Sequence, residues 1–358
     1  MASHSGKPDF QQLFERLTRI ARMQSALLFI LLVAVFFLME PARWILGDTD
    51  KSPLEIKGST AISNSSQEKK ILWEAPNIED ETDEAKKKQL RYGKELVVNT
   101  ANYFGPSGTI EANRTNGLNC QNCHLDAGTK VFGNNYSRVS ALYPKMRARS
   151  GQVEDVYKRI NDCFERSLNG KALDPTSKEM EAMVAYILFV GKDVPKGETP
   201  EGSGFKDLAF LERPIDPEKG RKVYQEKCIS CHQSDGQGLI DKSGRYTYPP
   251  LWGPLSYNDG AGLYRMSNFA KYVKWNMPLG ASHDSPQLTD EEAWDVAAWV
   301  NTQSRPKKDL KGDWPDRSKK PFDHPFGPYS DGFSEEQHKF GPYGPIKKYR
   351  DDATNGLP

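Results

Sequence analysis

Two copies of one pentapeptide constrain this chain more than any other feature of its sequence. Both copies have the spacing Cys-x-x-Cys-His, and they stand at Cys120-Gln-Asn-Cys123-His124 and Cys228-Ile-Ser-Cys231-His232. This spacing is the attachment signature of a c-type haem, in which two thiols bind the porphyrin covalently and the adjoining histidine is held beneath the iron. A structural zinc site also uses Cys-x-x-Cys pairs, but it does not require a histidine after each pair. The sequence therefore predicts two covalently bound haem c groups.

The surroundings of the two motifs are similar, which indicates an internal duplication. Before the second motif, Asp216-Pro217 opens a helix that contains Gly220, and Gly93 lies in a similar pattern before the first motif. After the motifs, Thr176 and Thr289 each start a Thr-x-x-Glu capping box ahead of an amphipathic helix. We expect a mainly α fold with two tandem class I cytochrome c domains, at residues 86–200 and 201–305, separated by a linker rich in Pro and Gly.

The N-terminal region indicates export. Residues 25–39 are all small or apolar and follow Arg16, Arg19 and Arg22, which is the charge order of an export signal whose N-terminus stays inside. No small-x-small cleavage site follows the apolar run, so we expect residues 1–46 to be an uncleaved membrane anchor rather than a cleaved signal. Residues 47–85, rich in Ser, Lys, Glu and Asp, are expected to form a stalk. The globular part would then lie in the periplasm, anchored to the cytoplasmic membrane.

The C-terminal residues 306–358 are rich in Pro and Gly, which disfavours long helices and central strands. Their many aromatic side chains instead predict an extended strap packed over the two domains. His324 and His338 lie in this tail, and we interpret them as packing or solvated histidines rather than as iron ligands.

Composition excludes two classes of protein. The chain has 49 basic and 48 acidic residues, so it lacks the positive field that nucleic-acid binding requires. A hydrophobic fraction of 37% and a mean hydropathy of −0.71 exclude a membrane protein with many spans.

Each predicted haem also needs a second iron ligand, which class I cytochromes bring from the loop before the last helix. Met277-Pro278 stands in this position after His232, whereas Met266 lies in a helical pattern typical of a core residue. After His124, a similar offset leads to Cys163, the one cysteine outside the two motifs. A free cysteine is often simply a small buried hydrophobe. In an exported protein, however, a thiol without a task is liable to oxidation.

The surroundings of Cys163 favour a chemical role. Residues 153–169 have helical periodicity, and the spacing of four places Arg159, Cys163 and Ser167 on one side of this helix. A guanidinium one turn from a thiol favours the thiolate, which is the form that ligates iron and attacks sulfur. Residues 136–171 contain eight basic and four acidic residues. This pattern indicates a site for a small anion.

The motifs resemble those of the dihaem thiosulfate dehydrogenases, also described as tetrathionate reductases. The resemblance covers about residues 92–345 and rests on four strings, at 120–129, 159–170, 249–260 and 276–278. It implies an active-site haem with ligands His124 and Cys163, an electron-transfer haem with ligands His232 and Met277, and substrate contacts at Arg159 and Ser167. Some members have a lysine just before the methionine. This chain has Asn276 there, and an amide is not expected to displace Met277 from the iron.

The resemblance predicts an enzyme that interconverts thiosulfate and tetrathionate and exchanges electrons with a soluble cytochrome c or a similar protein. An alternative is a membrane-tethered dihaem electron carrier with no substrate of its own, in which Cys163 would only tune a haem potential. A dihaem peroxidase or gas sensor would require an open iron position, which neither predicted ligand pair leaves.

Overall fold

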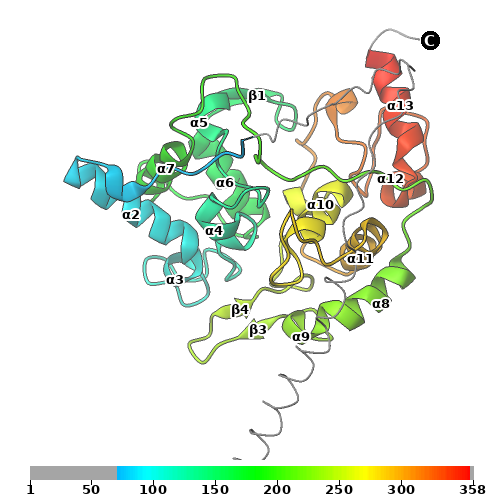
Figure 1. Ribbon diagram of the computed structural model, residues 1–358, viewed down its shortest axis with the longest axis horizontal. Coiled ribbons are helices and arrows are strands. Elements are labelled where there is room, and N and C mark those ends of the chain that lie inside the picture. Colours follow the sequence, from blue (N-terminus) through cyan, green and yellow to red (C-terminus); the bar gives the residue numbers. More distant parts are fainter. Residues whose placement is uncertain (1–70, 355–358) are drawn as a thin grey trace, which may run out of the picture. The chain divides into compact units, whose positions relative to one another are not determined.

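The computed structural model describes residues 71–354, which form a mainly helical body (Figure 1). The prediction of a mainly α fold is confirmed. The expected membrane anchor, residues 1–46, and residues 47–70 of the expected stalk lie outside the described residues. No helix between residues 71 and 354 is long and apolar enough to cross a membrane.

The first half of the described chain builds one hydrophobic core around two long helices. Its helices are η1 Ile78–Asp80, α2 Glu84–Val98, α3 Thr100–Phe104, η2 Cys120–Asn122, α4 Leu125–Gly128, α5 Val139–Leu142, α6 Val156–Arg166 and α7 Lys178–Val190. The strands β1 Lys145–Arg147 and β2 Gln152–Glu154 form an antiparallel hairpin in which Met146 lies opposite Val153. The hairpin leads directly into α6, which begins after Asp155; the Asp155 carboxylate caps the helix by accepting from the Lys158 amide at 2.8 Å.

The second half repeats this plan around its own core. Its helices are α8 Pro217–Lys227, α9 Ile229–His232, η3 Gly262–Tyr264, α10 Met266–Asn276 and α11 Asp290–Thr302. Strands β3 Leu239–Ile240 and β4 Tyr246–Tyr248 form a second antiparallel hairpin. In each half the haem motif follows the first long helix, and the last helix packs across that first helix.

Glycine allows the two helix crossings to be close. A Cβ at Gly93 of α2 would lie 2.0 Å from the Ala182 carbonyl oxygen of α7. A Cβ at Gly220 of α8 would lie 1.8 Å from the Asp295 carbonyl oxygen of α11. Both distances are far below any allowed contact, so any side chain here would force the helices apart. The equivalent positions of the two glycines support an internal duplication.

Of the two predicted capping boxes, the structure contains one. At α11 the capping box is confirmed, because Thr289 and Glu292 each bind the other's backbone amide. At α7 the prediction was wrong, since Ser177 rather than Thr176 caps the helix and accepts from the Met180 amide. The Thr176 hydroxyl instead donates to the Asp174 carboxylate in the preceding turn.

The ends of the described chain are more structured than expected. Residues 71–85 are not a free spacer, because the Trp73 amide donates to the Glu201 carbonyl and Ile78 is buried in the first core. The tail contacts both halves, because Tyr343 is buried in the second core and the Trp314 amide donates to the Arg149 carbonyl oxygen, but it is not purely extended. It forms η4 Arg317–Lys319, α12 Glu335–Phe340 and α13 Tyr343–Thr354. Proline is compatible with α13 because Pro345 lies in its first turn, where the backbone amide has no partner within the helix.

Candidate functional site

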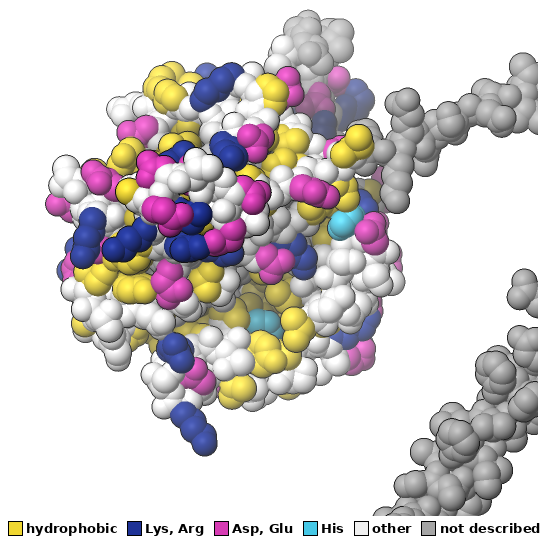
Figure 2. Space-filling view, turned by 60° about the vertical axis from the view of Figure 1, so that its left-hand side comes forward, with side chains coloured by type: hydrophobic (Ala, Val, Ile, Leu, Met, Phe, Trp, Pro, Cys, Tyr) yellow, Lys and Arg dark blue, Asp and Glu magenta, His cyan; other side chains and the backbone are white. Residues whose placement is uncertain are grey.

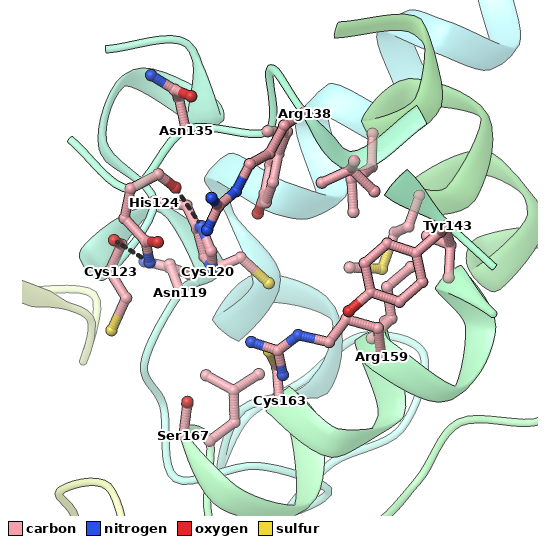
Figure 3. Close-up of a pocket in the computed structure, with 18 of the residues that line it drawn as sticks. Asn119, Cys120, Cys123, His124, Asn135, Arg138, Tyr143, Arg159, Cys163 and Ser167 are labelled. Atoms are coloured by element: carbon pink, nitrogen blue, oxygen red, sulfur yellow. Dashed lines mark hydrogen bonds between the residues drawn. The ribbon is translucent and has the colours of Figure 1, made fainter. Parts of the chain in front are cut away.

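Cys120, Cys123 and His124 line a cavity inside the first half, and Cys163 lies in the wall of the same cavity (Figure 3). Apolar side chains such as Leu118, Val156 and Ile187 form much of the remaining wall. Apolar walls and two cysteines beside a histidine are the surroundings that a covalently attached porphyrin requires. The residues present therefore fit a haem c group.

His124 is held in the orientation of an iron ligand. Its Nδ1 donates to the Asn134 carbonyl oxygen at 2.6 Å, which leaves the lone pair of Nε2 available for a metal. Burial lowers the pKa of His124 to about 4, so the ring is neutral at physiological pH. The Tyr136 ring lies 4.6 Å from the imidazole, centroid to centroid, and limits its rotation.

Helix α6 brings the other predicted site residues to this cavity. Val156, Ile160 and Phe164 are buried on one face of the helix, and Val156 and Ile160 also line the cavity. Arg159, Cys163 and Ser167 all line the cavity, as their spacing predicts, and Figure 3 shows the Arg159 guanidinium beside Cys163 with Ser167 one turn further on. The Cys163 sulfur raises the pKa of Arg159 further above its already high value. Arg159 is therefore a permanent cation next to the sulfur.

The second half contains a corresponding apolar cavity. Cys228, Cys231, His232 and Met277 all line it. His232 Nδ1 donates to the Pro249 carbonyl oxygen at 2.9 Å, the same arrangement as at His124. On the face shown in Figure 2, hydrophobic side chains surround a hollow in the surface. These residues also fit a haem c group.

The methionines considered as second iron ligands lie in different surroundings. Met277 follows α10 and lines the cavity of the second motif, whereas Met266 is 1% exposed and packs in the core. Asn276 does not line this cavity, and its amide nitrogen donates to the Phe132 and Tyr272 carbonyl oxygens at 3.2 Å each. In the first half Met180 and Met183 are both buried in the core, and Met183 also lines the cavity of the first motif.

The two cavities lie close together. Cys123 of the first motif lines both of them, as does Leu118. The Tyr272 hydroxyl of α10 donates to the Asn122 carbonyl oxygen inside the first motif at 2.7 Å. The first motif therefore forms part of the wall of the cavity that contains the second motif. This proximity suits electron transfer between two haem groups.

Several site residues were missed by sequence reasoning. Arg149 and Arg166 were counted only within a basic segment, yet both line a further cavity beside Cys163. Trp314 and Lys319 of the tail also line it. The aromatic content of the tail indicated packing, but no local pattern indicated packing at this position.

Comparisons with known proteins point to one family. Residues 110–195 match the family model described as SoxA/TsdA, cytochrome c domain, and residues 217–304 match the cytochrome c model. The chain is 44% identical over 195 residues to a thiosulfate dehydrogenase of Allochromatium vinosum, covering 53% of this chain and 71% of the relative. It is 40% identical over 203 residues to a thiosulfate dehydrogenase of Psychrobacter arcticus, covering 56% of this chain and only 60% of that relative. A solved thiosulfate dehydrogenase, TsdBA of Marichromatium purpuratum, superposes with a TM-score of 0.61 at 30% identity and covers 66% of this chain and 50% of its own.

Proposed function

Because the chain belongs to the thiosulfate dehydrogenase family, we propose that it joins two thiosulfate ions into tetrathionate with release of two electrons, and that it also catalyses the reverse reaction. The observation that carries this proposal is the position of Cys163 beside the Arg159 guanidinium, in the wall of the cavity that contains the first Cys-x-x-Cys-His motif. A redox centre, a nucleophilic sulfur and a fixed cation are the three groups that oxidation of a sulfur anion requires.

Each of the two cytochrome c domains holds one covalently bound haem c. In our proposal, Cys120 and Cys123 attach the first haem, which His124 and Cys163 ligate, and the second is attached by Cys228 and Cys231 and ligated by His232 and Met277. When bound, the haem groups supply one-electron redox chemistry, with the lower potential at the thiolate-ligated site. A soluble cytochrome c or a similar protein would accept the electrons from the second site.

Cys163 would take part in the chemistry. Arg159 holds the sulfonate of one thiosulfate with charge-assisted hydrogen bonds, and the Ser167 hydroxyl donates another. The Cys163 thiolate and the sulfane sulfur then form an S–S bond, and two electrons leave one at a time. The sulfane sulfur of a second thiosulfate attacks the sulfane atom of this adduct, the bond to Cys163 breaks, tetrathionate leaves and the Cys163 thiolate returns.

An electron carrier without a substrate is the less favoured alternative. It would need no cation beside the first haem, whereas Arg159 lines that cavity and a further cavity rich in arginine adjoins it. Family membership also favours the enzyme.

We further propose that the protein is exported and that residues 1–46 anchor it in the cytoplasmic membrane. The basic flank, the apolar run at residues 25–39 and the missing cleavage site support an anchor. Thioether formation on two motifs also requires export. Release of the protein from membranes by high salt, together with a mature N-terminus after residue 40, would replace the anchor with a cleaved signal.

The proposed function is tested with Cys163→Ser and Cys163→Met in the full chain carrying both haem groups. Cys163→Ser should abolish thiosulfate oxidation, assayed with a redox dye, while mass spectrometry still shows two attached haem groups. Cys163→Met retains an iron ligand but removes the nucleophile, so substantial activity in this variant would exclude the covalent step. In the unmodified protein, a mass increase on Cys163 that a reductant reverses would support it. Arg159→Ala should mainly weaken thiosulfate binding, and Arg221→Ala on the exposed side of α8 is its matched control.

A further inference from the structure

A second cavity, of about 420 Å³, adjoins the cavity of the first motif, which has about 160 Å³. At their junction the two cavities share six lining residues, which are Cys123, His124, Asn134, Arg159, Cys163 and Ser167. The outer part of the second cavity is built from segments distant in sequence: the β1 hairpin, the start of α10 and the C-terminal tail. These segments contribute Lys145, Arg147, Arg265, Asn268, Trp314 and Lys319 to the lining.

The tail is a fixed wall of this outer cavity. Asp313 accepts two hydrogen bonds from the Arg166 guanidinium, both at 2.7 Å, one turn beyond Cys163 on α6. The Trp314 amide donates to the Arg149 carbonyl oxygen at 2.7 Å, and the Arg149 guanidinium lies over the Trp314 ring. These contacts hold the tail at the end of α6.

The outer cavity has more cations than its carboxylates neutralise. Seven cationic side chains line it but only one acidic side chain, Asp162. Carboxylates behind the wall pair with five of these cations, in the ion pairs Arg147–Glu154, Arg149–Asp313, Arg166–Asp313, Arg265–Asp323 and Lys319–Asp316. Within residues 71–354, neither Lys145 nor Arg159 has a carboxylate within ion-pair distance.

The cations that line this cavity also repel one another. Burial and the neighbouring Arg147 and Arg138 lower the pKa of Lys145. Burial, Arg166 and Arg159 also lower the pKa of Arg149, to about 10, even though Asp313 is near. A bound anion would relieve this repulsion, and a dianion would relieve it most.

We propose that the outer cavity is a separate binding site for the second thiosulfate, with Lys145 as its main cation. This inference rests on the proposed function. Tetrathionate has a sulfonate at each end, so a site that assembles it needs two separate groups of cations. Arg159 serves the sulfonate of the thiosulfate at Cys163. Lys145 binds the sulfonate of the second thiosulfate. Together with the positive field of Arg147 and Lys319, it offsets the repulsion between the two dianions.

Binding is measured without turnover by titrating thiosulfate into the Cys163→Ser protein with both haem groups attached. Calorimetry should show two thiosulfate ions bound per chain, and one after the further change Lys145→Ala. Lys178→Ala is the matched control, because Lys178 is 81% exposed at the start of α7 and lines neither cavity. This variant should still bind two thiosulfate ions per chain. One bound ion before the Lys145 change, or two after it, would overturn the proposal. If two ions bind but the unmodified protein does not oxidise thiosulfate, the proposed function fails and the anion site stands.

Steady-state kinetics with Cys163 intact give a second measurement. Loss of a charge-assisted hydrogen bond in Lys145→Ala should raise the half-saturating thiosulfate concentration roughly tenfold or more. The mass of the first adduct on Cys163 and the spectrum and potential of the first haem should not change. A shifted potential with unchanged thiosulfate dependence would show that Lys145 pairs with a haem propionate, which would also overturn the proposal.

Discussion

The ion pair between Arg166 and Asp313 should be the main tie between the C-terminal tail and α6. Its geometry is bidentate, with both N–O distances at 2.7 Å, and the side chains are only 11% and 9% exposed. Asp313→Ala removes the carboxylate and leaves the Arg166 guanidinium nearly buried without its partner. Arg149 also loses a carboxylate that lies 3.9 Å from its Nε.

The loss of stability expected for Asp313→Ala follows from this burial. Removing one partner of a buried ion pair typically costs about 3–5 kcal/mol, because the other charge remains desolvated. Since each side chain here is about a tenth exposed, we expect the lower end, about 3 kcal/mol. For a folded body of this size, that corresponds to a fall in the melting temperature of about 6–12 °C.

Thermal unfolding of the protein with both haem groups attached measures this effect. Asp207→Ala is a matched control, because Asp207 pairs with Lys271 at the same 2.7 Å but is 97% exposed, so its loss should change the melting temperature little. The double variant Arg166→Met/Asp313→Ala should recover part of the loss, since the charge of Arg166 no longer remains buried without a partner. If Asp313→Ala lowers the melting temperature no more than Asp207→Ala does, the tail is not held by this pair.

Three further predictions concern the second haem, a helix crossing and the acid limit of the fold. Met277→Gly should lower the potential of the second haem, because methionine ligation raises it; an unchanged higher-potential wave in a redox titration would contradict this ligand. Gly220→Ala should destabilise the fold by about 1–3 kcal/mol, since the new Cβ would lie 1.8 Å from a backbone oxygen of α11. A Cβ at Gly344 in α13 would meet open space, so Gly344→Ala should leave the free energy of unfolding unchanged. If denaturant unfolding shows losses of similar size in both variants, this reasoning is refuted. Burial alone would raise the pKa of Asp323, but Arg265 and neighbouring hydrogen bonds lower it to about 2. Its contribution is therefore present above the unfolded pKa of about 4 and lost as the pH falls toward 2, so Asp323→Asn should flatten the acid limb of stability against pH; an equally steep limb would contradict this.

Much of the fold and the placement of the candidate site residues could be predicted from the sequence because the signals are local. The capping of α8 by Asp216 and of α11 by Thr289 depends on residues within one helical turn. The alignment of Arg159 with Cys163 depends only on the helical repeat. Where two neighbouring residues can both act as a cap, as Thr176 and Ser177 can, the local pattern does not decide between them.

The sequence by itself determined the two Cys-x-x-Cys-His motifs and the side of α6 that faces the first of them. Thioether formation needs a fixed covalent spacing, and a helix has a fixed period, so both are properties of short segments. Only the tertiary structure decided that Trp314 and Lys319 of the tail form a wall beside Cys163, and that Lys145 remains without a carboxylate there. Such a wall depends on packing between segments more than a hundred residues apart in the printed sequence, and no local spacing encodes that packing.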